Sequence, residues 1–154
     1  MIPCTHFIPA YSELFKYLED RGGPEAVRDF WCYLSDNFLG NLHDLVEEHG
    51  IEGCWKYWNH TLNEEAADFT MEIDPEAGLF RVEMHHCPSR GLLNELEHLE
   101  PYHDYCGHCD VLYRRVLEPL GYECDFDMSR CDEAKCTFTV RRKEREGKSA
   151  RHGG

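Results

Sequence analysis

The sequence predicts an α+β fold in which N-terminal helices pack on a four-stranded antiparallel sheet made of two hairpins separated by helices. Apolar residues recur at helical spacing through residues 1–65, and the pattern then changes to strict alternation. The 154 residues, 42% of them hydrophobic, are enough for one packed core. We therefore expect a single globular domain over residues 1–142, with a helical half and a mixed half over residues 66–142. Residues 143–154 are typical of a disordered tail.

Three helical segments are expected in the first half. Apolar side chains recur from Tyr11 to Leu18, the Gly22-Gly23 pair ends this segment, and a proline then opens a second helix that reaches Phe38. Gly40 bends or interrupts that helix. A third, shorter helix covers residues 51–62. Their aromatic side chains are interpreted as core rather than as the lining of a ligand cavity.

Alternation of apolar and polar residues predicts the strands, and two helical segments lie between the two pairs of strands. The first of these helices follows Pro88 and is expected to end at Pro101, because proline cannot continue a helix. The second begins near Cys106 and runs to Leu120, followed by Gly121. The expected strands are residues 69–73 and 80–86, joined at Pro75-Glu76-Ala77-Gly78, and residues 122–128 and 136–140, joined by residues 129–135.

Charge and hydropathy exclude several classes of function. The chain carries 30 acidic and 16 basic residues, a formal charge of −14, and such a surface repels phosphate backbones and anionic bilayers. We expect neither a nucleic-acid partner nor a membrane role. No stretch approaches the roughly 20 apolar residues of a membrane span, and the N-terminus does not resemble an export signal. A cytoplasmic protein is expected, and the exposed edges of the hairpins favour a homodimer.

Nine cysteines are a high number for a protein in a reducing compartment, where a disulfide framework is not expected. Cys106 and Cys109 form a Cys-x-x-Cys pair at the start of a helix, and Cys131 and Cys136 lie on either side of a turn. Four thiolates grouped in two pairs can close a tetrahedral site around zinc. A metal site on these four cysteines is the first hypothesis.

Simple lengths support convergence of the two pairs. The helix from Cys106 to Leu120 is about 22 Å long, and the returning strand covers about 23 Å. The end of that strand, with Cys131 and Cys136, is therefore expected near the start of the helix. Strand parity further predicts that His86, like Cys136 and Cys124, shares the apolar face; Cys124 is interpreted as a packed hydrophobe.

Other ligands and other uses of the sulfurs remain open. Cys87 joins the cluster if the Pro88 helix folds aside, and His103 and His108 are further candidates because imidazole can replace a thiolate. An iron–sulfur cluster also takes four thiolates. A redox dithiol at a helix N-terminus is the least favoured alternative, because residues 101–105 do not supply the strand that a thioredoxin-like site requires.

The mixed half resembles a known family. Its segments Met84-His85-His86-Cys87-Pro88, Cys109-Asp110, Leu120-Gly121-Tyr122 and Cys136-Thr137-Phe138 are similar to the L-2-amino-thiazoline-4-carboxylic acid hydrolase family. Residues 66–141 also resemble the vinyl-reductase-type small-molecule-binding domain. The first resemblance implies a functional site with Cys87, Cys109 and Cys136, and the second implies zinc ligands at Cys109, Cys131 and Cys136. Cys106 and His108 lie outside both patterns.

Three functions follow from these patterns. The leading one is a zinc-dependent hydrolase of a small cyclic amide or thiazoline-type substrate, in which His86 or His103 moves a proton. In a metal-free variant of this chemistry, Cys87 is a nucleophile activated by His86. The second function is a small-molecule-binding or sensor domain with a structural metal. The third is an iron–sulfur protein that carries electrons.

Overall fold

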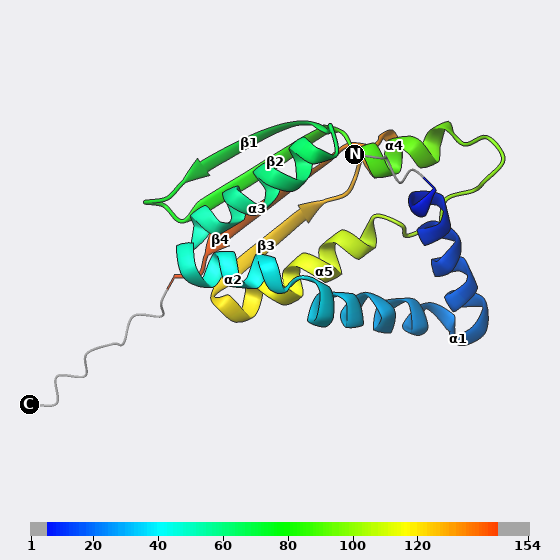
Figure 1. The fold of residues 1–154 in the computed structure, drawn as a ribbon, viewed down its shortest axis with the longest axis horizontal. Helices are drawn as coiled ribbons and strands as arrows, with labels where there is room; N and C mark the ends of the chain where they lie inside the picture. Colours follow the sequence, from blue (N-terminus) through cyan, green and yellow to red (C-terminus); the bar gives the residue numbers. More distant parts are fainter. Residues whose placement is uncertain (1–5, 145–154) are drawn as a thin grey trace, which may run out of the picture.

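A computed structural model describes residues 6–144 of the protein and shows an α+β fold (Figure 1). Of the predicted tail, residues 143–154, the part from residue 145 onward lies outside the described residues. No helix in this described part has both the length and the apolar character needed to cross a bilayer. The elements in order are α1 (Phe7–Phe38), α2 (Gly40–His49), α3 (Ile51–Glu64), β1 (Asp68–Asp74), β2 (Leu79–His86), α4 (Pro88–Glu95), α5 (Gly107–Leu117), the 3-10 turn η1 (Glu118–Leu120), β3 (Tyr122–Asp127), the 3-10 turn η2 (Cys131–Glu133) and β4 (Cys136–Arg142).

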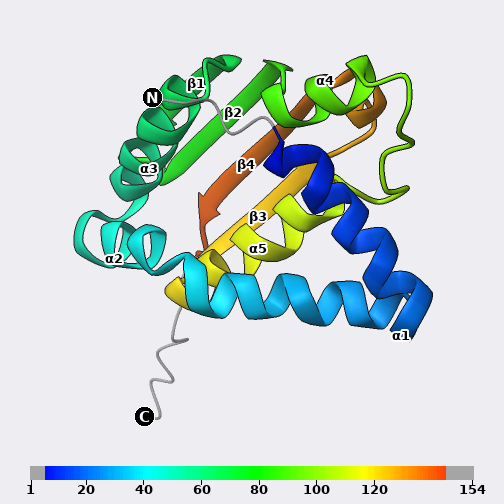
Figure 2. The same ribbon diagram turned by 45° about the vertical axis from the view of Figure 1, so that its right-hand side comes forward.

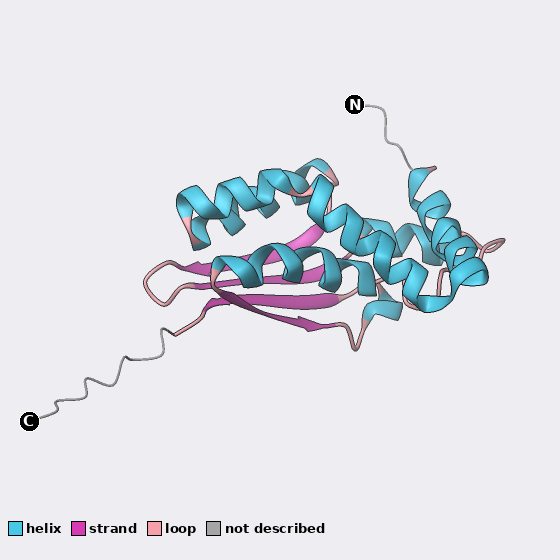
Figure 3. Cartoon of the chain, turned by 90° about the horizontal axis from the view of Figure 1, so that it is seen from below, coloured by secondary structure: helices cyan, strands magenta, loops and turns pink. Residues whose placement is uncertain are grey.

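The four strands form one antiparallel sheet in the order β1-β2-β4-β3. The two predicted hairpins are confirmed, and they are joined along a seam where β2 pairs with β4. On one face, Val82 lies between Met71 and Phe138, and this apolar face is covered by the helices (Figure 3). The opposite face carries polar residues such as Arg81, which pairs with Glu72. The sheet is therefore half-buried, and this explains the strict alternation in its sequence.

Helix α1 is two arms joined at a break, as the Gly22-Gly23 pair predicts. Gly23 has φ 75° and ψ −176°, which a residue with a side chain adopts only with strain, and the two arms meet at a clear angle (Figure 2). The Ser12 hydroxyl accepts a hydrogen bond from the Tyr102 N–H at 2.8 Å. On the second arm, the Ser35 hydroxyl donates to the Leu112 carbonyl at 2.7 Å. The bent helix therefore holds both α5 and the loop that precedes it.

Two details of the predicted elements are wrong. Helix α4 ends at Glu95 rather than at Pro101, because the chain at Leu96 is extended (φ −86°, ψ 93°). His86 does not share the buried face; its side chain is exposed. The pairing of β1 with β2 shifts register between Asp68 and Phe69, opposite the end of β2, so the strict alternation is lost at His86.

A glycine in α3 allows the close approach of α3 to α2. A methyl group on Gly53 would lie 2.2 Å from the Leu45 carbonyl oxygen, which is backbone and cannot turn aside. Gly53→Ala is therefore expected to lower the free energy of unfolding by about 1–3 kcal/mol through overpacking. Urea unfolding measures this. The matched control is Gly40→Ala, because Gly40 has no atom within 4 Å of an added Cβ. Equal stability of the two variants would contradict the close packing.

Candidate metal centre

One end of the sheet gathers the segments that carry the cysteines. Cys136, the first residue of β4, pairs with Met84 near the end of β2. The Cys87 N–H donates to the Ala134 carbonyl at 2.8 Å, which ties the start of α4 to the turn before β4. Cys87 and Cys136 therefore lie at the same end of the sheet, and α4 folds aside rather than carrying Cys87 to the opposite end.

The start of α5 approaches this end from the helical side. Cys106 precedes the first residue of α5, and Cys109 lies in its first turn. Cys106 and Cys131 line a common cleft of about 360 Å³, together with the side chains of Arg28, Trp31 and Arg90. Each predicted cysteine pair thus contributes one residue to the lining of this cleft.

The pKa values of the thiols show which cysteines lie within electrostatic range of one another. Burial raises the pKa of Cys106, and nearby Cys109, Cys131 and Cys87 raise it further, whereas Arg90 lowers it. Burial also raises the pKa of Cys136 to about 12, with added contributions from Cys109, Cys87 and Cys131. The structure therefore groups five thiols, which we call the thiol cluster: Cys87, Cys106, Cys109, Cys131 and Cys136.

The cluster is loose in this structure. Among residues 6–144, no three of these sulfurs lie with all their distances within 4.8 Å. Burial raises the pKa of Cys109 to about 12 and also raises that of Cys87, so these thiols are protonated at neutral pH. A bound cation would lower the pKa of these thiols, because it favours the thiolate form and offsets the repulsion between neighbouring negative sulfurs. By donor type, cysteine sulfurs suit a thiophilic ion such as zinc.

A histidine beside Cys109 contacts a sulfur of the cluster. The His108 Nε2 atom lies 3.5 Å from the Cys109 sulfur. The other ring nitrogen, Nδ1, donates a hydrogen bond to the Tyr105 carbonyl oxygen. Burial lowers the pKa of His108, so the ring is neutral at pH 7, with its proton on Nδ1 and a free lone pair on Nε2.

The other two predicted histidines are placed less favourably. The exposed His86 ring packs against Gly91, where an added Cβ would lie 2.4 Å from Nε2, and no hydrogen bond joins it to Cys87 within residues 6–144. His103 lines the rim of the cleft, but its Nε2 atom lies 2.9 Å from a carboxylate oxygen of Glu19. Neither imidazole contacts a sulfur of the cluster.

A carboxylate that the sequence analysis did not single out affects the cluster. Glu65 follows α3, and its charge raises the pKa of Cys109 and Cys87, and also that of the Tyr113 hydroxyl. Burial raises the pKa of Glu65 itself. Glu65 is one of 30 acidic residues and no local pattern marks it. Only the packing of α3 beside α5 brings it toward the sulfurs.

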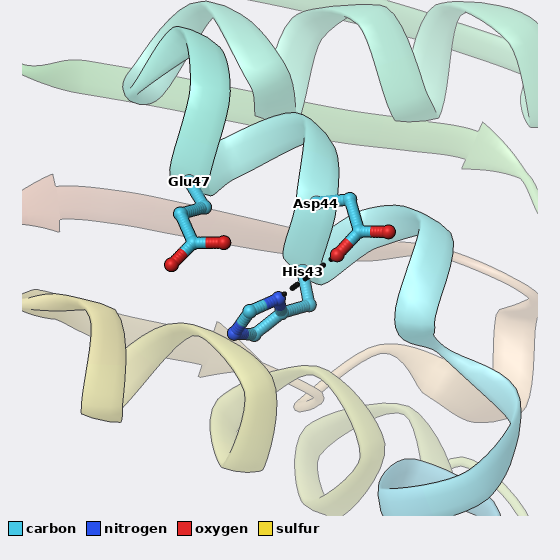
Figure 4. A group of neighbouring side chains, drawn as sticks. All are labelled: His43, Asp44 and Glu47. Carbon is cyan, nitrogen blue, oxygen red and sulfur yellow. Dashed lines mark hydrogen bonds and ion pairs between the residues drawn. The ribbon is translucent and has the colours of Figure 1, made fainter.

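A second group of potential ligands lies on α2, on the surface of the molecule (Figure 4). The ligand atoms of His43, Asp44 and Glu47 lie within 4.8 Å of one another, and His43 Nδ1 is 3.2 Å from Asp44 Oδ1. These side chains are solvated and come from consecutive turns of one helix, where such pairs are ordinary. The group lies apart from the thiol cluster, and nothing further points to an ion there.

Comparisons with known proteins add no relative. The chain matches no model of a protein family, and no curated protein or solved structure is significantly similar to it. Its function must therefore follow from the geometry of the site.

Proposed function

We propose that this protein binds zinc at the thiol cluster and hydrolyses a carbon–nitrogen bond of a small cyclic amide or thiazoline-type molecule. The observation that carries the proposal is that five cysteines from four separate segments lie within electrostatic range of one another, and that two of them line a cleft. Thiols in a reducing compartment that gather in this way favour metal binding over a disulfide framework. Two of them, Cys106 and Cys131, lie where a molecule in the cleft could reach the ion.

The cleft suits a small, partly polar molecule. Its volume of about 360 Å³ lies at the lower end of the range for small-molecule sites. Trp31 supplies apolar surface, Arg28 and Arg90 supply positive charge, and Asp104 and Asp110 supply negative charge. Arg90 is largely buried, its terminal Nη2 lies 3.3 Å from Asp132, and its Nε has no hydrogen-bond partner within the described structure. The two arginines could orient a carboxylate or a carbonyl oxygen of the substrate.

In the proposed reaction, the metal ion and the side chains of the protein have separate roles. A zinc ion held by the thiol cluster would supply Lewis-acid chemistry, activating water and polarising a C=N or C=O bond of the substrate. Arg90 beside Cys106 fixes the substrate.

Metal analysis and an activity assay together test the proposal. Protein purified without chelator should contain about one zinc per chain and should hydrolyse thiazoline carboxylates or cyclic amides. Cys131→Ser should lose turnover, whereas Cys32→Ser, on α1 and outside the cluster, should keep it. Absence of bound metal would overturn the proposal. Zinc with binding of such molecules but no turnover would favour a binding domain, and iron with sulfide would favour an electron carrier.

A further inference from the structure

We infer that His108 is a ligand of the metal together with Cys109, so that the centre has mixed nitrogen and sulfur ligands instead of four thiolates. This inference rests on the proposed metal binding and specifies which atoms hold the ion. Its basis is geometric: His108 Nε2 and Cys109 Sγ already stand at ligand spacing, and the imidazole is held in place from the opposite side.

The distance between these two atoms matches a metal site. Zinc bonds to imidazole nitrogen at about 2.0–2.1 Å and to thiolate sulfur at about 2.3 Å, so two such ligands on a tetrahedral ion lie about 3.6 Å apart. The observed Nε2 to Sγ distance is 3.5 Å. In the absence of an ion, the thiol can donate a weak hydrogen bond to Nε2. When the ion binds, the thiol proton leaves to solvent and both atoms turn their lone pairs to the metal.

The opposite nitrogen of His108 has the partner that metal-bound histidines usually have. Nδ1 donates to the Tyr105 carbonyl oxygen, which fixes the tautomer and aims Nε2. Aromatic rings surround the imidazole, and their centroids lie 4.8 Å (Tyr105), 5.4 Å (Tyr11) and 5.8 Å (Phe15) from its own. The ring therefore has little freedom to rotate, and its orientation is prepared before any ion arrives.

The remaining ligands would come from the rest of the cluster, although among residues 6–144 no third His, Cys, Asp or Glu donor atom lies within 4.8 Å of both His108 Nε2 and Cys109 Sγ in this structure. Cys106 is the closest in sequence, and the pKa of Cys106 responds first to burial and next to Cys109. Cys87, Cys131 and Cys136 are the other candidates. An imidazole in place of one thiolate lowers the negative charge of the ligand set by one, which leaves the ion a stronger Lewis acid for a bound water or carbonyl.

Zinc titration in competition with a chromophoric chelator tests the assignment on the full chain. His108→Phe preserves the size and aromatic character of the ring but lacks the nitrogen, and it is expected to bind zinc at least about tenfold more weakly than the wild type. His103→Ala is the control, because His103 is bound to Glu19 and is not a ligand in this assignment. It should bind zinc as tightly as the wild type.

Spectroscopy of the wild type keeps the test independent of whether the variant folds. X-ray absorption of the zinc-loaded protein should show imidazole scattering together with two or three sulfurs, and His103→Ala should keep the imidazole signal. Four sulfurs without imidazole, or unchanged affinity in folded His108→Phe, would overturn the inference and leave the proposed zinc binding standing. A wild-type protein that binds no zinc would overturn both.

Discussion

Replacement of Trp58 by alanine is expected to lower the free energy of unfolding by about 3–5 kcal/mol. Trp58 lies on α3, is 2% exposed, and stands between the sheet and α5. Its ring centroid lies 4.9 Å from that of Phe138, 5.0 Å from that of Tyr113 and 5.5 Å from that of Phe80. Removing the indole leaves a cavity between aromatic side chains of the sheet and of α5. The hydrogen-bonded strands on one side keep the surrounding residues from closing this cavity.

Equilibrium unfolding in urea, followed by circular dichroism, measures the loss. Trp58→Phe should recover part of the stability, because it restores aromatic contact but not the full volume. Phe38→Ala serves as the control for removing a large aromatic side chain, because Phe38 is 74% exposed and its loss should change stability by less than about 0.5 kcal/mol. Similar losses for Trp58→Ala and Phe38→Ala would show that this core is packed otherwise than described.

Zinc is expected to stabilise the folded protein, and Cys109→Ala is expected to abolish this effect. A ligand that binds only the folded state adds about 2.7 kcal/mol when its free concentration is one hundred times the dissociation constant. Cys109 contributes, after burial, to the raised pKa of Cys87, Cys106 and Cys136. Its loss therefore removes the thiol that lies within electrostatic range of three of the other four thiols of the cluster.

The measurement is the thermal midpoint with and without zinc, under reducing conditions. Cys54→Ala provides the matched control. Cys54 is also a buried thiol, with a pKa raised by burial to about 12, but it lies on α3 and its coupled neighbour is Cys124 rather than the thiol cluster. This variant should lose intrinsic stability yet keep the full zinc increment. If zinc still raises the thermal midpoint of Cys109→Ala, the ion binds at another site.

Much of the fold follows from periodicity. The switch from helical spacing to alternation near residue 67 correctly predicts the boundary between α3 and β1, because a half-buried strand imposes a period of two. The glycine pair correctly predicts the break in α1. The length of α4 was not predictable, because its end at Glu95 depends on how the following loop packs against α1 and not on a breaker in the local sequence.

Some features of the candidate site were likewise predictable from the sequence, and others were not. Matching the length of α5 to that of β3 suffices to expect Cys109 and Cys136 at one end of the molecule. The exposed position of His86 was not predictable, because it follows from an irregularity in the pairing with β1. No sequence pattern pointed to Glu65. His108 was visible as a candidate, but the carbonyl that holds its ring belongs to Tyr105 and becomes apparent only once the loop before α5 is folded.

The seam between β2 and β4 links the thiol cluster to the alignment of the whole sheet. Cys136 stands opposite Met84 through main-chain pairing alone, and Cys87 follows three residues later on the same strand's continuation. A slip of β4 by two residues would keep every side chain on its proper face, yet it would carry Cys136 about 7 Å along the strand. An ion that bridged these two cysteines would bind only when β4 pairs with β2 in the native register. It would therefore favour that register over a shifted one while the chain folds.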